Sequence, residues 1–172
     1  MLTLSGPLTQ REAPRVLREG EAQLGQARAR SLAATVALAS GRVHAAARGY
    51  ADAFELAEAA GERHAAASFL VNLGLAHLDV GHPGPATGAL REGARRLVRL
   101  GRDADSARAL YNLANAALLI GDDDLAGAAV DRASEAARRG GDAVAAAWAS
   151  LVRAELAVRR GALQDARREA DD

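Results

Sequence analysis

Glycine recurs every twenty residues along most of this sequence. The positions are Gly41, Gly61, Gly81, Gly101, Gly121, Gly141 and Gly161. Each interval carries apolar residues at helical spacing, and proline occurs within these intervals only near the start of one. Glycine is the usual residue in the left-handed conformation that ends a helix. The spacing therefore predicts a series of helices of roughly 16 to 18 residues, each ended by a glycine and a short turn.

Small residues recur at intervals of forty residues, which groups the predicted helices into pairs. The small-residue columns are Ala46, Ala86, Ala126 and Ala166; Ala34, Gly74, Ala114 and Ala154; and Ala53, Gly93 and Ala133. A column of large residues consists of Leu38, Leu78, Leu118 and Val158. Small residues let two helices approach closely, and the large ones fill the space between them. Because one pair cannot bury its apolar faces alone, the pairs must stack into a solenoid.

The segment NLGLAHLDVGHPGPATGAL, residues 72–90, has a Leu-Gly pair at Leu73 and Gly74, followed by His77 and then by Ala86 and Leu90, with Gly93 just beyond. It resembles the tetratricopeptide repeat (TPR) family. The pair Leu73 and Gly74 matches the Leu-Gly pair of the family's first helix, and His77 stands where an aromatic residue is usual. Ala86, Leu90 and Gly93 match the second helix. ARALYNLANAALLIGD, residues 107–122, is similar to the subgroup with forty-residue repeats found in kinesin light chains, Pins-type scaffolds and many bacterial regulators. The resemblance covers about residues 24–172. It implies an all-α, right-handed superhelical solenoid of antiparallel helix pairs.

The expected boundaries follow from this register. Residues 1–22 are interpreted as part of a preceding helix or a linker, and residues 23–172 as the solenoid. The four repeats are predicted at about 24–61, 62–101, 102–141 and 142–172. Only eleven residues follow Gly161, so the fourth repeat is expected to be truncated, with a short last helix. The apolar series on its first helix, Val144, Ala147, Leu151 and Ala154, is then expected to be covered by another chain, end to end, or by a tail folding back.

The resemblance also implies a binding groove, because the first helix of each tetratricopeptide repeat lines the concave side of the stack. The expected peptide-binding residues are Asn72, Arg108, Tyr111, Asn112, Asn115, Trp148 and Glu155. Asn72 and Asn112 are forty residues apart and occupy the same place in adjacent repeats. An amide both donates and accepts hydrogen bonds and can therefore hold a peptide backbone, while Arg108 could bind a carboxylate. The alternatives are that the asparagines satisfy carbonyl groups between helices or face water, and that Trp148 belongs to the core.

Charge and composition disfavour several classes of function. The chain has 22 basic residues, 22 acidic residues and no cysteine. The formal net charge of zero gives no general attraction to nucleic acid or to a membrane surface. The four histidines lack the spacing of zinc ligands, and no serine, aspartate or glutamate is placed with a histidine as in a nucleophilic site. No enzyme activity, metal or cofactor is therefore expected.

Charged residues are interpreted mainly as structural. Arg91, Arg95, Arg99 and Arg102 form a basic stripe at helical spacing, but Arg95 shares its column with Glu55 and Glu135. The register therefore favours a ladder of surface ion pairs between repeats over a site for phosphate or an acidic partner. The run DDD, residues 122–124, is expected to cap a helix start.

The function expected from these features is that of a protein- or peptide-binding scaffold module in the cytoplasm of a bacterium. The second interpretation is a sensor segment of a bacterial signalling regulator, whose groove binds a small molecule or the regulator's own catalytic domain. A third is a purely structural spacer. An open channel would favour a peptide, a closed pocket around Arg108 and Trp148 would favour a small ligand, and a flat surface would favour the spacer.

Overall fold

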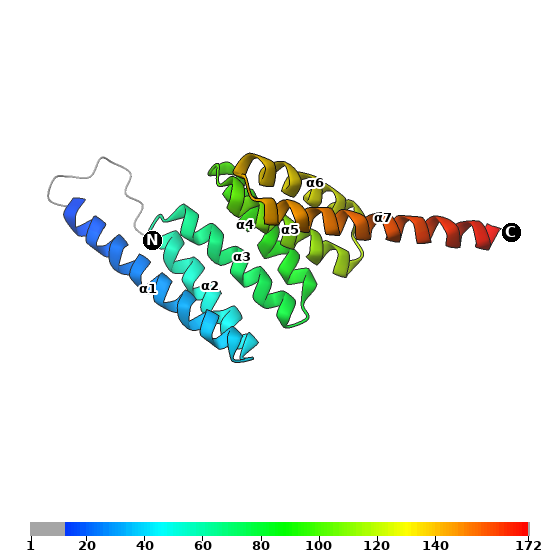
Figure 1. Cartoon of the computed structure of the whole chain (residues 1–172). Coiled ribbons are helices and arrows are strands. Elements are labelled where there is room, and N and C mark those ends of the chain that lie inside the picture. The colour runs from blue at the N-terminus through cyan, green and yellow to red at the C-terminus, as the bar shows by residue number, and fades with distance from the viewer. Residues whose placement is uncertain (1–12, 172) are drawn as a thin grey trace.

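The structure is a computed structural model that describes residues 13–171, which form seven α-helices and contain no strand (Figure 1). The helices are α1 (Ala13–Ala39), α2 (Val43–Ala59), α3 (Arg63–Asp79), α4 (Pro83–Arg99), α5 (Asp103–Ile120), α6 (Asp123–Gly140) and α7 (Ala143–Asp171). Each helix packs against the next one along the chain. The predicted all-α class is therefore confirmed, and the arrangement is compatible with an α-solenoid.

The first six glycines of the series end helices as predicted. Gly41, Gly61, Gly81, Gly101, Gly121 and Gly141 all have positive φ, between 65° and 77°. After each of them, the next residue donates its N–H to the carbonyl five residues earlier, as Asp122 does to Ala117 at 3.0 Å. This bond satisfies a carbonyl that the helix end would leave free. One local motif thus ends six successive helices.

The prediction that Gly161 also ends a helix is wrong. α7 runs for 29 residues through Gly161, which does not have positive φ. Glycine costs only about 1 kcal/mol in a helix interior. The following residues, ALQDARREA, are mostly strong helix formers and continue the helix. The expected short last helix is therefore the C-terminal part of α7, which projects beyond the other helices (Figure 1).

The division at residues 22 and 23 does not coincide with a break in the structure. α1 is a continuous helix of 27 residues that begins at Ala13, with Pro14 in its first turn. Proline is tolerated there because the first N–H groups of a helix have no partner within it. Residues 13–22 are therefore the first part of α1, and residues 1–12 lie outside the described part of the chain.

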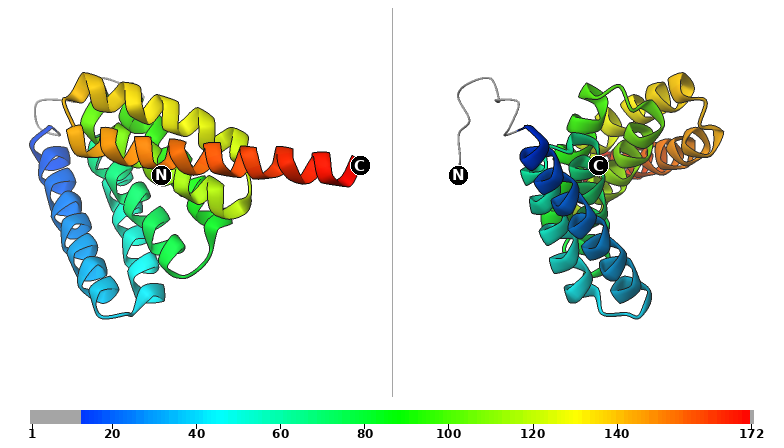
Figure 2. Two further views of the ribbon diagram at one scale, coloured as in Figure 1. Left: turned by 45° about the vertical axis from the view of Figure 1, so that its right-hand side comes forward. Right: turned by 90° about the vertical axis from the view of Figure 1, so that its left-hand side faces the viewer.

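Two layers result from this packing. α5 contacts α3 on one side and α7 on the other, so these alternate helices form one layer, and the even-numbered helices lie beside it. Figure 2 shows that the direction of the helices turns progressively from α1 to α7. This layer is the surface on which the expected binding residues lie.

The small-residue columns form the contacts between the layers. Ala46, Ala86 and Ala126 have no exposed surface, and neither do Ala53, Ala114 and Ala133. A Cβ atom on Gly74 would lie 2.6 Å from the Cγ atom of Leu90, so only glycine allows α3 and α4 their present separation. The last members of two columns differ: Ala154 is exposed, and the side chain of Ala166 lies outside the description. Among residues 13–171 no helix covers the side of α7 that carries Ala154, so this residue is exposed.

Candidate functional site

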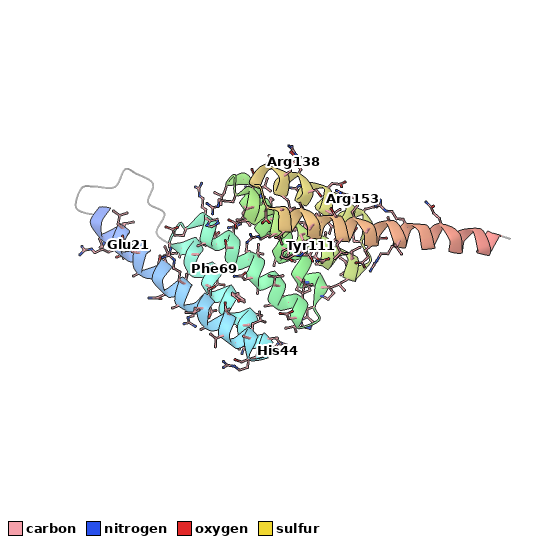
Figure 3. The ribbon with its side chains drawn as sticks, in the orientation of Figure 1. Glu21, His44, Phe69, Tyr111, Arg138 and Arg153 are labelled. Carbon is pink, nitrogen blue, oxygen red and sulfur yellow. The ribbon has the colours of Figure 1, made fainter. Side chains whose placement is uncertain are left out.

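The expected binding residues lie on the three adjacent helices of one layer. Asn72 is on α3, while Trp148 and Glu155 are on α7. Arg108, Tyr111, Asn112 and Asn115 are on α5, between these two helices. We call the surface of these seven residues the candidate groove. Figure 3 shows Tyr111 where α5 lies against α7.

The three asparagines of the candidate groove have no structural partner. Asn72, Asn112 and Asn115 are each half-buried, and none forms a side-chain hydrogen bond within residues 13–171. Amides that bridge neighbouring helices would show such bonds, since buried polar groups are nearly always paired. Three half-buried amides are therefore left to bind water or a ligand.

Trp148 and Tyr111 join the middle of the candidate groove on α5 to its end on α7. Their rings stack with centroids 5.2 Å apart and an interplanar angle of 27°. Trp148 is 42% exposed, so it belongs to the surface and not to the core. Stacked aromatic rings of this kind form a rigid apolar platform with polar groups at its edge. The pairing of these two residues was not predicted from the sequence, because it depends on the contact between α5 and α7.

Arg108 is already partly engaged. Its Nε donates to Oδ2 of Asp142 at 3.0 Å, and the other carboxylate oxygen of Asp142 accepts the backbone N–H of Ala145. The bond from Ala145 and then that from Arg108 lower the pKa of the Asp142 carboxyl. The Arg108 side chain is still 60% exposed. Its terminal nitrogens make no other hydrogen bond in the described part of the chain, and they can bind a second anion.

Arg159 is a residue of this surface whose role the sequence did not reveal. Its Nη1 donates to the carbonyl oxygen of Leu118 at 3.0 Å, near the end of α5. Its Nη2 lies 3.2 Å from Glu155, and its Nη1 lies 3.8 Å from the carboxylate of Asp123. Oδ1 of Asp123 is buried without a hydrogen bond within the described residues. Arg159 thus ties α7 to α5, and Glu155 is an ion-pair partner as well as a groove residue.

The apolar residues near the end of α5 differ in exposure. Leu118, expected to fill the space between paired helices, is only 5% exposed and packs in the core. Leu119 is 65% exposed and Ile120 is 45% exposed. Leu118 is buried because it lies in the core cluster formed with the neighbouring helices, whereas Val158 of the same column is exposed.

None of the four arginines of the basic stripe pairs with its expected partner: Arg102 pairs with Asp105, and Arg91 and Arg99 form no ion pair with any described residue. Arg95 pairs with Glu92 of its own helix, and the ion pair between α2 and α4 is made by Arg96 and Glu58, 2.6 Å apart.

The predicted helix cap at residues 122–124 is confirmed, because Oδ1 of Asp122 accepts the N–H of Leu125 at 2.9 Å.

Other kinds of site find no support in residues 13–171. Their histidines and carboxylates form no group of three that could hold a metal ion. No helix among them has the length and apolar character needed to cross a membrane. No protein-family model matches the sequence, and a comparison with curated proteins gives no match.

Proposed function

We propose that this protein is a tetratricopeptide-like, right-handed superhelical solenoid whose candidate groove binds an extended peptide segment of a protein partner. The observation that carries the proposal is the set of unpaired, half-buried amides of Asn72, Asn112 and Asn115 beside the stacked rings of Tyr111 and Trp148. Amides and aromatic rings together match the needs of a peptide, which offers backbone polar groups and side chains in alternation.

The repeat spacing supports an extended ligand. Asn72 and Asn112 occupy the same place in α3 and α5, and neighbouring helices pack about 8–10 Å apart. About three residues of an extended chain cover that distance. The two amides can therefore hold the peptide backbone at intervals of about three residues, while Leu75 and Tyr111 contact the side chains between them.

The charges of the groove favour an acidic residue at one end of the ligand. Arg108 keeps its terminal nitrogens available beside Asn112, although Asp142 neutralises part of its charge. Glu155 repels a carboxylate placed further along α7, and this repulsion is reduced by its own ion pair with Arg159. The preferred ligand carries one carboxylate next to Arg108 and apolar side chains near Trp148.

The test is selection of peptides on the folded chain from a random library, followed by calorimetric titration of variants. Asn112→Ala should weaken binding of the selected peptide by about 5- to 150-fold, equivalent to about 1–3 kcal/mol. Its melting temperature should stay the same or rise slightly, because alanine is the better helix former.

Two arginines provide the matched control. Arg108→Ala should weaken the binding of acidic peptides, whereas Arg132→Ala, at an exposed position of α6 outside the candidate groove, should leave it unchanged. Loss of stability at Asn112→Ala without loss of binding would identify a structural amide. If the selected peptides bind the Asn72→Ala and Asn112→Ala variants as tightly as they bind the native chain, the proposed groove is refuted.

A further inference from the structure

The face of α7 that points away from the other helices is apolar and uncovered. Val144 is 58% exposed, Leu151 is 66% exposed and Val158 is 72% exposed. Ala147 and Ala154, which lie between them on the same side of the helix, are also exposed. We call these residues, together with the partly exposed Gly161, the α7 stripe.

Several positions of α5 that are equivalent to the α7 stripe are covered by a neighbouring helix. Ala107, Ala114 and Leu118 precede three residues of the stripe by forty positions, and all are 5% exposed or less because α6 packs on them. On α7 the corresponding residues, Ala147, Ala154 and Val158, have no covering helix in the described structure. Half of the stripe thus consists of positions that a helix covers on α5, whereas Val144 and Leu151 correspond to the half-buried Ala104 and Tyr111.

The residues of the stripe alternate in size with a seven-residue period. Large residues occupy positions 144, 151 and 158, and small residues occupy 147, 154 and 161. A seven-residue repeat lets two helices pair along their length with a slight left-handed supercoil. No charged residue interrupts the stripe between residues 144 and 161.

We propose that the α7 stripe binds the α7 stripe of a second copy of this chain, in antiparallel orientation, to form a two-fold symmetric dimer. When the second helix is reversed, each large residue of the stripe meets a small one. Val144 faces Gly161 of the second copy, Ala147 faces Val158, and Leu151 faces Ala154. Paired residue numbers always add up to 305. A parallel pairing would place equal sizes together and leave uneven layers, so the reversed arrangement fits best.

The size of the contact makes this dimer weak. Residues 144–161 span about 27 Å, and two helices in contact over that length bury roughly 1,000 Å² in total. That area lies at the lower end of specific interfaces, so we expect a dimer that dissociates on dilution. Glu155 lies at the edge of the stripe, and the two-fold axis brings the Glu155 side chains of both copies onto the same edge. Each of these charges is partly neutralised by its own Arg159 at 3.2 Å.

The first experiment is sedimentation over a wide range of protein concentration. The native chain should reach a dimer and no larger species, because a two-fold contact is closed. Leu151→Glu should weaken the dimer at least about tenfold, since it places two charges in the apolar centre. Glu155→Gln should strengthen it by about two- to fivefold. A strictly monomeric native chain would overturn the proposal.

The matched control for Leu151→Glu is Leu32→Glu on α1, since both leucines are 66% exposed. The control should dimerise as the native chain does. If Leu32→Glu also dissociates the assembly, or if larger species form with increasing concentration, the copies associate end to end through α1 and the proposal is wrong.

The orientation is tested by cross-linking, which is specific because the native chain has no cysteine. A mixture of the Val144→Cys and Gly161→Cys variants should form a disulfide between the two variants, and neither variant should cross-link alone. Efficient cross-linking of Val144→Cys alone would show a parallel pair and overturn the antiparallel arrangement. The proposal does not depend on the peptide groove, and its readouts need no ligand.

Discussion

The ring of Tyr111 stacks on the ring of Trp148, with the two ring centroids 5.2 Å apart, and this contact joins α5 to α7 within the candidate groove. Trp148 is the single tryptophan of the chain. Its fluorescence therefore reports on this surface alone. Because Trp148 is 42% exposed, a ligand that covers it must change its emission.

We expect Tyr111→Ala to shift the emission of Trp148 to longer wavelength, because the indole loses its apolar neighbour and becomes more hydrated. The variant should also lose about 0.5–1.5 kcal/mol of unfolding free energy from the stacked pair, in addition to the apolar area lost. Tyr111→Phe keeps the ring and should leave both quantities nearly unchanged. Emission scans and denaturant titrations measure the two effects, and unchanged emission in Tyr111→Ala would mean that the rings do not stack in solution.

The contact between Gly74 and Leu90 allows a second prediction. Gly74→Ala should destabilise the protein by about 1–3 kcal/mol, because its Cβ atom would lie 2.6 Å from Cγ of Leu90 and 3.2 Å from the carbonyl oxygen of Ala86. Gly88→Ala is the control, since a Cβ atom there meets nothing within 4 Å. That variant should be stabilised by up to about 1 kcal/mol through its higher helix propensity. Equal melting temperatures for both variants would contradict the close packing of α3 on α4.

The sequence predicted the helices well because one local motif repeats. The left-handed glycine, as at Gly41, depends on a few neighbouring residues and is therefore visible in the sequence. The buried columns, such as Ala46 and Ala86, were equally visible because the repeat places them at equal intervals. These features gave the helical class, six helix ends and the positions of the closest contacts.

Features that depend on distant contacts were predicted less well. Gly161 has the same spacing as the other glycines, but α7 continues through it, and no helix among residues 13–171 folds back on α7. The ion pair between α2 and α4 joins Glu58 to Arg96 instead of Glu55 to Arg95, because the offset between stacked helices selects the partners. The stack of Tyr111 on Trp148 was missed for the same reason. A column of equivalent positions does not reveal which side chains meet across two helices.

The glutamate of α4 makes stability depend on pH in the acidic range. Hydrogen bonds from Arg95 and then from Arg96 lower the pKa of Glu92 from 4.5 to about 2. The folded pKa lies below the unfolded one, so this contribution is fully present above about pH 4.5 and is lost as pH falls toward 2. Glu92 is one-third exposed, so screening by solvent limits the contribution to about 1 kcal/mol.

Glu92→Gln should therefore lower the unfolding free energy at pH 7 by about 1 kcal/mol and leave it nearly unchanged at pH 2. Denaturant titrations at both pH values measure the difference. Glu55→Gln serves as the control, because Glu55 is exposed and makes no ion pair with any described residue. A stability difference for Glu92→Gln that is the same at pH 7 and pH 2 would exclude the proposed ionic contribution.

The glycines at 121 and 161 should respond in opposite ways to the same substitution. Gly121 has φ of 76° in the turn after α5, whereas Gly161 lies within α7 with nothing within 4 Å of an added Cβ atom. Gly121→Ala should destabilise the protein by about 1 kcal/mol or more, because alanine is strained in the left-handed region. Gly161→Ala should be neutral or stabilise by up to about 1 kcal/mol through helix propensity. Calorimetric melting compares the two, and a loss of stability at Gly161→Ala as large as that at Gly121→Ala would show that the chain turns at residue 161 after all.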